Sequence, residues 1–412
     1  MCEPERKVEA QRKSGTPGKH IPGVFSSVYD LEGKMKKFVS VLLLAVMCTM
    51  MLTSCGAKKE EEPETYKIGF IGPLTGATSM YGNAVMNGAA MYFEELNKNG
   101  GINGRQVEFI AMDSEGDKAK AKNAYERLAT VDEVCAIVGP VLTGETEVVA
   151  QAAAADGLPL ITASATGDAL SSYGDALFRT CFKDSFQGVK LADYAKEVLG
   201  MSKVAVLYAN NDAYSKGLYE AFKDECSKIG LEIVATESYA TGDSDYKAQL
   251  TNIANAAPEA VFFPYYYAEC YDAATQARDL GLTVPFLGGD GFSALLSYEG
   301  ADMSVIEGFV YSDHFSSEAG NAEVNAFAKA YNDKYGYAAL GFSFLAYDAA
   351  MIVADAIDKC DSADWDAIRN QMKKTDMDCL TGHYVFDAEN NPIKQAAMIV
   401  IKNGEGVFDR MF

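Results

Sequence analysis

Short apolar segments alternate with segments of helical periodicity from Tyr66 to residue 287 of this 412-residue chain. The first pair consists of YKIGF at 66–70 and of 83–98, where apolar residues recur every three or four positions. Strand–helix alternation over such a length predicts parallel sheets covered by helices on both faces. Since roughly 100–200 residues form one domain, we predict an α/β fold with two doubly wound parallel-sheet lobes.

The alternation continues beyond the first strand and helix. Further strands are expected at 107–112, 134–138, 160–161, 204–208, 232–237, 260–263 and 286–287. Further helices are expected at 118–130, 145–156, 215–229, 246–255 and after Glu269. Open α/β sheets bind ligands beyond the carboxyl ends of their strands, so the loops that follow the strands are the places to look for a site.

Composition argues against several classes of protein. The formal net charge is −22, and an acidic surface of that size repels phosphate backbones, so nucleic-acid binding is not expected. Only three histidines and no CxxC pair occur, which argues against metal and redox centres. Neither GxGxxG nor GxSxG is found, so we expect a protein that is not an enzyme and that uses no cofactor and no metal.

A targeting signal is expected between Met35 and Cys55. Two lysines precede an apolar run of 15 residues at 38–52, which is shorter than the roughly 20 residues of a membrane-spanning helix. The run ends in LTSC, which resembles the lipobox of bacterial lipoproteins, where the cysteine is lipidated and becomes the mature N-terminus. We expect a signal peptide at 35–54, with lipidation of Cys55 anchoring the body to the bacterial cell membrane.

The segments beside this signal are polar. Residues 1–34 contain Pro and Gly without periodicity, and we expect a non-native or disordered extension there, with Met35 as the true start. Residues 55–65 are charged, mostly acidic and have nothing to bury, which predicts a flexible acidic tether. The folded body is therefore expected to begin at residue 66.

Hydroxyl residues follow two of the predicted strands. Thr143 lies in GPVLTGE at the start of a predicted helix, where a hydroxyl and free N–H groups can hold a carboxylate. The alternative for this segment is a simple N-cap. Ser164 and Thr166 lie in TASAT, where small side chains let a ligand approach the backbone, although a cap and turn fits as well.

An acidic residue and an aromatic residue lie near the ends of two other strands. Asp290 stands among glycines in GGDG, where a carboxylate can reach a buried cation, and an Asx-turn or a metal loop are the alternatives. Tyr81 ends the Gly-rich loop 69–81, which lacks the lysine of a phosphate-binding loop and is either a tight turn or a ligand contact. Asp243 and Asp245 are expected to cap a helix rather than to bind calcium.

Taken together, these segments resemble the branched-chain-amino-acid-type periplasmic binding proteins of ABC transporters, which have a type I bilobal fold. The resemblance runs from about Lys67 to the C-terminus. It is carried by the order and spacing of IGFIGPLTGATSMYGNAVMNGAAM, GGINGR, VGPVLTGET, LITASAT, NDAYSKG, YATGDSDYKAQL, FFPYYYAE, ARDLGLTVPFLGGDGF and IVIKNGEG. It implies two lobes joined by a three-crossing hinge, with lobe 1 at 66–184 plus 315–393 and lobe 2 at 185–314 plus 394–412.

The resemblance also implies roles for residues of lobe 1. Thr143 corresponds to a hydroxyl that contacts the α-carboxylate of an amino acid. Ser164 corresponds to a backbone position that receives both ends of the ligand, and Thr166 corresponds to a second hydroxyl that meets them. Tyr81 corresponds to an aromatic residue that lines the cleft.

In lobe 2 the resemblance implies a partner for the other end of the ligand. Asp290 corresponds to the acidic residue that holds the α-ammonium, although it is shorter than the glutamate often found there. Tyr266 corresponds to an aromatic residue near the same group, and Tyr214 to one that lines the cleft. A ligand held by both lobes would close them as it binds.

The function implied is that of an extracytoplasmic solute-binding lipoprotein of an ABC importer. We expect a monomer that binds a small amino acid, branched-chain or otherwise aliphatic or aromatic, and delivers it to permease and ATPase subunits. A ligand-sensing protein for a membrane receptor, or an importer component for urea or short amides, are the alternatives, since one fold serves several functions. The cysteines of the body are expected to be buried small residues, with a Cys360–Cys379 disulfide as the alternative.

Overall fold

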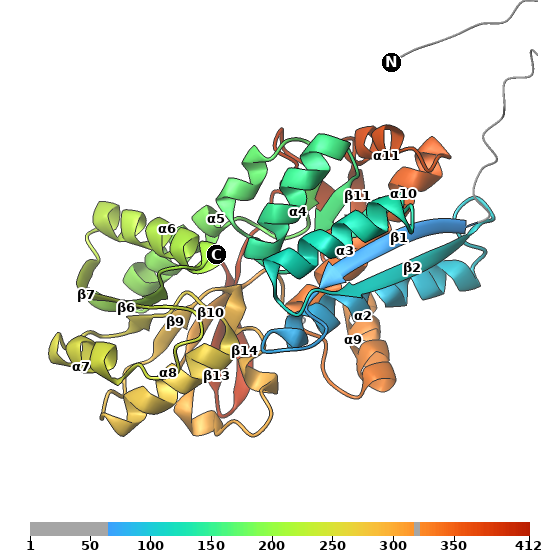
Figure 1. The fold of residues 1–412 in the computed structure, drawn as a ribbon. Coiled ribbons are helices and arrows are strands. Elements are labelled where there is room, and N and C mark those ends of the chain that lie inside the picture. The colour runs from blue at the N-terminus through green and yellow to red at the C-terminus, as the bar shows by residue number, and fades with distance from the viewer. Residues whose placement is uncertain (1–64, 317–321) are drawn as a thin grey trace, which may run out of the picture. The chain divides into compact units, whose positions relative to one another are not determined.

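The computed structural model describes residues 65–316 and 322–412. The predicted extension at 1–34, the signal peptide at 35–54, the lipidation site Cys55 and nearly all of the tether at 55–65 lie outside the described residues. The described residues form two main sheets and a separate two-stranded sheet. We call the part built on the five-stranded sheet lobe 1 and the part built on the seven-stranded sheet lobe 2 (Figure 1).

The sheet of lobe 1 is parallel throughout, in the order β2-β1-β3-β4-β5. Its strands are β1 (Thr65–Gly72), β2 (Gln106–Asp113), β3 (Ala136–Val138), β4 (Leu160–Thr162) and β5 (Leu177–Arg179). Its helices are α2 (Ser79–Lys98), α3 (Lys118–Thr130), α4 (Thr143–Asp156), α9 (Ala322–Tyr335), α10 (Gly341–Cys360) and α11 (Trp365–Met372).

Strand β1 shows why this sheet is covered on both faces. Its side chains alternate, so that Ile68 and Phe70 pack with α2 and α10, whereas Ile71 packs with α3 and α4 in a separate core cluster. Gly69 points to the α3 side, where a Cβ would lie 2.8 Å from a methyl group of Leu128. The apolar run in β1 is therefore that of a strand buried between two helical layers.

The sheet of lobe 2 has the order β14-β13-β10-β9-β8-β6-β7. Its strands are β6 (Lys203–Ala209), β7 (Glu232–Tyr239), β8 (Val261–Phe262), β9 (Phe286–Gly288), β10 (Val310–Asp313), β13 (Ala397–Lys402) and β14 (Glu405–Met411). Its helices are α5 (Asp184–Asp193), α6 (Ala213–Ile229), α7 (Lys247–Asn255) and α8 (Tyr267–Asp279). Short 3-10 and π turns of this lobe lie at Tyr194–Val198, Asp290–Phe292, Leu295–Ser297 and Met303–Val305, and a further 3-10 turn lies between β4 and β5 of lobe 1, at Asp168–Ser172.

The last two strands of lobe 2 run antiparallel to their neighbours, so this sheet is mixed rather than purely parallel. They form a hairpin whose two-residue loop is Asn403-Gly404, with φ of 55° and 76°. Positive φ at both positions is what a tight hairpin turn requires, and Asn-Gly is the pair that adopts it most readily. The hairpin adds an antiparallel edge to a parallel sheet without changing the fold class.

The chain passes between the two sheets three times, as the fold class predicts. It crosses after β5 into α5, after β10 towards α9 and α10, and again from the two-stranded sheet of β11 (Asp376–Cys379) and β12 (Gly382–Val385) into β13. The first and third crossings carry the chain into lobe 2, and the second carries it back to lobe 1. The residues at which each lobe begins and ends remain a prediction.

Helix α11 brings Trp365, the single tryptophan of the chain, to the outer side of lobe 1. Its indole N–H donates a hydrogen bond to the carbonyl of Val134 at 2.9 Å. The ring packs against the core cluster that α3 and α4 share. This residue therefore reports on the packing of lobe 1.

The cysteines of the described residues are free thiols. Cys135, Cys181, Cys226 and Cys270 are buried, in agreement with their expected role as small core residues. The alternative of a Cys360–Cys379 disulfide is wrong, because both thiols are free and that of Cys360 is directed at carbonyl groups at the end of α10.

Within residues 65–316 and 322–412, none of the helices combines the length and the apolar character that crossing a membrane requires.

Candidate ligand-binding site

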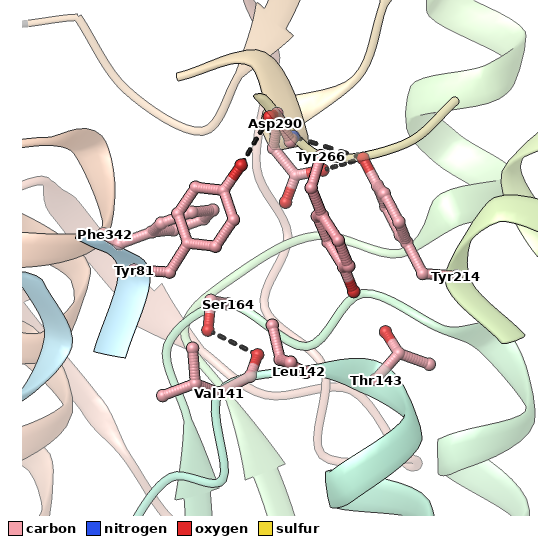
Figure 2. Close-up of a pocket in the computed structure, with 10 residues that line it drawn as sticks. Tyr81, Val141, Leu142, Thr143, Ser164, Tyr214, Tyr266, Asp290 and Phe342 are labelled. Carbon is pink, nitrogen blue, oxygen red and sulfur yellow. Dashed lines mark hydrogen bonds between the residues drawn. The ribbon is translucent and has the colours of Figure 1, made fainter. Parts of the chain in front are cut away.

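A small cavity lies where the carboxyl ends of strands from both lobes meet (Figure 2). Its empty space is about 270 Å³, part of which is open to solvent. Six of the seven predicted ligand residues line it, and Thr166 does not. The lining residues are Tyr81, Val141, Leu142, Thr143, Ser164, Tyr214, Tyr266, Asp290, Gly291 and Phe342.

Lobe 1 contributes hydroxyl groups to this cavity. Thr143 is the first residue of α4, two residues earlier than the predicted start of that helix, and its Oγ1 accepts the Gly167 N–H at 3.3 Å. The hydroxyl proton of Thr143 is therefore free to be donated to a ligand. Ser164 follows β4 and donates its hydroxyl to the carbonyl of Val141 at 2.8 Å. A hydroxyl donor beside the N–H groups of a first helical turn suits a carboxylate.

Thr166 lies behind this surface rather than on it. Its side chain is fully buried, and its carbonyl accepts the backbone N–H of Asp184 at 2.9 Å. The segment thus joins β4 to the start of α5. Contact of the Thr166 hydroxyl with a ligand remains a prediction.

Lobe 2 contributes a carboxylate that is almost fully occupied by protein donors. Asp290 follows β9 and is 2% exposed. Its Oδ1 accepts hydrogen bonds from the Tyr214 hydroxyl at 2.8 Å and from Gln187 Nε2 at 3.1 Å. Its Oδ2 lies 3.1 Å from His314 Nε2. Since a carboxylate has about four acceptor positions, one position on Oδ2 remains open.

Among the residues that the structure describes, no lysine or arginine pairs with the carboxylate of Asp290. Its one recorded ion-pair partner among the described residues is His314, which carries charge only when protonated. No lysine or arginine of residues 65–316 and 322–412 donates a hydrogen bond to it. A buried carboxylate with this environment favours a cationic group in the cavity it faces.

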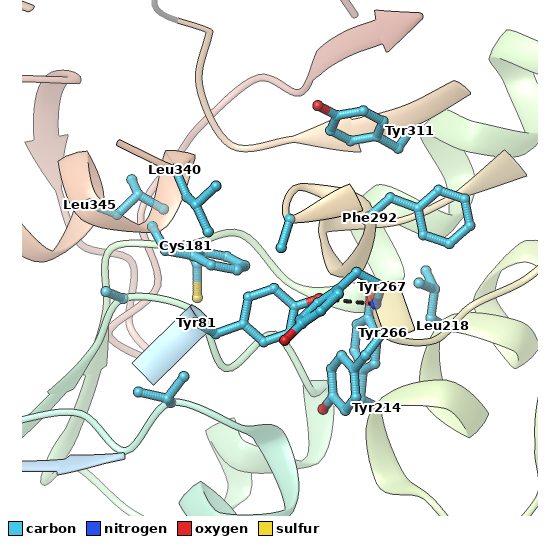
Figure 3. Close-up of a cluster of buried hydrophobic side chains, with 14 of the residues drawn as sticks. Tyr81, Cys181, Tyr214, Leu218, Tyr266, Tyr267, Phe292, Tyr311, Leu340 and Leu345 are labelled. Atoms are coloured by element: carbon cyan, nitrogen blue, oxygen red, sulfur yellow. Dashed lines mark hydrogen bonds between the residues drawn. The ribbon is translucent and has the colours of Figure 1, made fainter. Parts of the chain in front are cut away.

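Tyrosines form the wall between the two lobes. Tyr214 and Tyr266 stack with ring centroids 5.3 Å apart and an interplanar angle of 4°. Tyr81 reaches across from lobe 1 and donates to the carbonyl of Gly291 at 2.5 Å (Figure 2). It also accepts the Tyr267 N–H at 3.3 Å (Figure 3). Burial raises the pKa of Tyr81, Tyr214 and Tyr266 well above the ordinary value, so these hydroxyls stay neutral.

A second hydrogen bond also joins the lobes beside the cavity. The hydroxyl of Tyr267, at the start of α8, donates to the carbonyl of Ala77, which lies just before α2, at 2.7 Å. Together with the contacts of Tyr81, it holds the two sides of the cavity together. The lobes are therefore in direct contact beside the cavity.

Three residues of the site lie outside the loops that the sequence analysis singles out. Phe342 at the start of α10 lines the cavity, and Gln187 and His314 hold Asp290. His314 directly follows β10, so the rule that selects residues after strands would have found it if 310–313 had been predicted as a strand. Gln187 and Phe342 lie on helices, where no sequence signal marks them.

Residues 65–405 match the model of a protein family described as periplasmic binding protein. Among curated proteins, the chain is similar to Leu/Ile/Val-binding protein homolog 3 of Brucella melitensis, with 36% identity over 227 residues. That match covers 55% of this chain and 61% of the relative, so it spans about three fifths of the relative's length.

Two solved structures are similar over most of the described residues. A leucine binding protein from Thermotoga maritima has a TM-score of 0.79 and 30% identity, over 84% of this chain and 99% of that chain. A branched-chain amino acid transporter substrate binding protein from Streptococcus pneumoniae, in complex with isoleucine, has a TM-score of 0.79 and 34% identity over the same shares, 84% and 99%. These relatives are binding proteins and not enzymes, in agreement with the missing catalytic motifs.

Proposed function

The chain belongs to the periplasmic binding protein family, and from that premise we propose that it binds a small amino acid, with a branched-chain one favoured, in the cavity between its lobes. The isoleucine complex of the Streptococcus pneumoniae relative supports this ligand class. The proposal assigns the ligand contacts to Tyr81, Thr143, Ser164, Tyr214, Tyr266 and Asp290, with Thr166 behind them.

The observation that carries the proposal is the open acceptor position of Asp290 opposite the hydroxyl donor of Thr143. An amino acid that enters a closed cleft loses water at both charged ends, so each end needs a partner. Thr143 and the first turn of α4 would receive the carboxylate from lobe 1. Asp290 would receive the ammonium from lobe 2, so one ligand contacts both lobes.

The remaining lining favours an apolar ligand side chain. Val141, Leu142 and Phe342 are apolar, and the ring faces of the tyrosines extend that surface. A charged ligand side chain would have to lose its hydration against these groups without a second ionic partner. We therefore infer that aliphatic amino acids bind more tightly than acidic or basic ones.

Ligand entry requires the lobes to separate. Tyr81 and Tyr267 join the lobes beside the cavity with hydrogen bonds, which would have to break as the lobes part. Three chain crossings allow such a rotation of rigid lobes by small changes in backbone angles. On this proposal the conformation described resembles the closed form in which a ligand would be enclosed.

We further propose that the protein works outside the cytoplasm, is anchored by a lipid on Cys55 and delivers its ligand to the permease of an ABC importer. The lipobox-like LTSC segment supports the anchor. The name of the Streptococcus pneumoniae relative supports the transport role.

Calorimetry on the purified body tests the ligand assignment. We expect leucine, isoleucine or valine to bind, and Asp290→Asn to weaken that binding at least about tenfold, since a charge-assisted hydrogen bond contributes roughly 1.5–3 kcal/mol. Asp279→Asn, an exposed aspartate on α8 of the same lobe, is the matched control and should bind like the wild type. Absence of binding by all three amino acids, or an unchanged affinity in Asp290→Asn, would disprove the assignment.

A further inference from the structure

His314 is a buried side chain that contacts Asp290. It directly follows β10 and is 2% exposed. Its ring lies against Phe182, with centroids 3.7 Å apart, and near Phe342, with centroids 5.9 Å apart. Its Nε2 is 3.1 Å from Asp290 Oδ2, the oxygen that keeps an open acceptor position.

The backbone of Phe182 determines which nitrogen of the His314 ring carries the proton. The Phe182 N–H donates to His314 Nδ1 at 3.4 Å, so Nδ1 must present a lone pair. A neutral ring then has its proton on Nε2, which donates to Asp290. A cationic ring would place an Nδ1–H against the Phe182 N–H, which is a contact between two donors.

We propose that His314 is a positioning residue for ligand binding: as the neutral Nε2–H tautomer it orients the Asp290 carboxylate so that one position of Oδ2 faces the ligand's ammonium. The inference rests on the proposed function, because it needs a cationic ligand group in the cavity. A neutral donor fixes the carboxylate without cancelling its charge. A lysine at the same place would compete with the ligand for that charge.

Burial favours the neutral form of His314. Burial lowers the pKa of His314 below its ordinary value of 6.5, the charge of Asp290 opposes that shift, and the charge of Lys394 adds to it. The neighbouring carboxyl of Asp313 has its pKa raised by burial to about 7. Asp184, on α5, has its pKa raised well above the ordinary value by burial and by the charge of Asp290. The carboxyls of Asp313 and Asp184 are thus shifted towards their uncharged forms.

Gln187 completes the arrangement on the other oxygen of Asp290. Its Nε2 donates to Asp290 Oδ1 at 3.1 Å and to Asp184 Oδ1 at 2.8 Å. Its Oε1 accepts from the Ser312 hydroxyl at 3.1 Å and from the Asp290 N–H at 3.2 Å. The amide is held from four directions, so its donor cannot turn away from Asp290.

The two supports come from different chain crossings. Phe182 lies at the first crossing, between β5 and α5, and Gln187 follows it near the start of α5. His314 lies at the second crossing, after β10. These are the segments that bend when lobes of this kind rotate. The orientation of the carboxylate that would hold the ammonium is therefore linked to the angle between the lobes.

Comparing the affinities of two ligands shows whether His314 acts on the ligand's ammonium or only supports the structure of the site. Leucine and 4-methylpentanoate share a carboxylate and a side chain, but the second lacks the ammonium. The variant His314→Phe keeps a ring between Phe182 and Phe342. We expect it to weaken the binding of leucine at least about tenfold and the binding of 4-methylpentanoate less than twofold. We expect His314→Gln, whose amide N–H can reach the Nε2 position, to restore most of the affinity for leucine.

Measuring leucine binding by His314→Phe in the Asp290→Asn background completes a double-mutant cycle. In that background His314→Phe should have almost no further effect on leucine affinity, because the carboxylate that His314 orients is gone. Equal losses for both ligands, or additive effects with Asp290→Asn, would overturn the positioning role while leaving amino-acid binding intact. A wild type that binds none of leucine, isoleucine and valine would instead refute the proposed function.

Nitrogen NMR of histidine-labelled protein tests the tautomer without a substitution. The chain has three histidines, His20, His314 and His383, and His383 is exposed and hydrogen-bonded to Asp378. We expect His314 to show a protonated Nε2 and an unprotonated Nδ1 over the pH range in which His383 titrates, and its Nε2–H signal to move when leucine is added. A proton on Nδ1 at neutral pH would overturn the proposal.

Discussion

Two polar clusters, each built around a buried carboxylate, lie near the crossings between the lobes, and they differ in how that carboxylate is balanced. The ligand-facing cluster is Asp290 with Gln187, Tyr214 and His314. The hinge cluster is Asp348 with Thr381, Tyr384 and Lys394. Both contain a carboxylate that is at most 2% exposed and a buried tyrosine. The hinge cluster contains an ammonium group, and the ligand-facing cluster does not.

In the hinge cluster the protein supplies its own cation. Lys394, in the third crossing, donates to the hydroxyls of Thr381 and Tyr384 and to the carbonyl of Thr180. Thr381 in turn donates its hydroxyl to Asp348, so one hydroxyl connects the ammonium with the carboxylate. A carboxylate balanced internally contributes to structure. A carboxylate that lacks such a partner leaves the pairing to a ligand, and this contrast suggests that stability and affinity are separable.

The largest expected effect is a loss of stability in Lys394→Met. It leaves the Asp348 carboxylate buried without its cation, and we expect the free energy of unfolding to fall by about 3 kcal/mol. Asp290→Asn should cost much less stability, although it weakens ligand binding. Urea unfolding of both variants without ligand checks this, together with calorimetry of each folded variant. Equal stability losses would show that the two clusters have the same role.

The pH dependence of stability should have opposite signs in the two clusters. Burial raises the pKa of Asp348 from 3.8 to about 6, so the folded state keeps a proton that the unfolded state loses, and stability falls as pH rises from about 4 to 6. Burial lowers the pKa of His314 from 6.5, so the unfolded state takes up a proton first, and stability falls as pH drops below 6.5.

Urea unfolding between pH 4 and 8 checks both signs. Asp348→Asn should remove a decrease of about 2 kcal/mol in the free energy of unfolding between about pH 4 and 6. His314→Gln should remove the loss of stability below pH 6.5. The shape of the curve is compared, so that a constant change in stability from either substitution does not matter. An unchanged slope in Asp348→Asn would mean that this carboxyl titrates normally in the folded protein.

The smallest expected effects come from a matched pair of hydroxyl deletions. Tyr384→Phe removes a hydroxyl from the hinge cluster and should cost about 1 kcal/mol of stability, with ligand affinity unchanged. Tyr214→Phe removes the hydroxyl that donates to Asp290 and should weaken leucine binding several-fold. Thermal unfolding and calorimetry on both variants give the comparison. A loss of affinity in Tyr384→Phe as large as that in Tyr214→Phe would contradict the separation.

Much of the fold could be predicted because its strands and helices carry local patterns. The helix at 118–130 begins and ends as predicted, since its N-cap Asp117 and its helical spacing are both local features. The strand at 310–313 was missed because VYSD is short and ends in polar residues. Its side chains are buried only by the rest of lobe 2, so nothing within the segment indicates a strand.

The site was predictable only where the resemblance supplied it. Asp290 and Tyr214 are 76 residues apart and Asp290 and Gln187 are 103 apart, so no local pattern could bring them together. The resemblance implies that Asp290 and Tyr214 touch a ligand. It does not indicate Gln187 or His314, which contact Asp290. Supporting residues of this kind depend on the packing of crossings, which only the three-dimensional structure describes.

The position of Trp365 has a practical consequence for spectroscopy. The single indole of the chain packs beside α3 and α4, and it is not among the residues that line the cavity. Its emission will follow the melting of lobe 1 and will be nearly silent when an amino acid binds. The optical signal of binding has to come from the cleft tyrosines or from a dye placed at the rim.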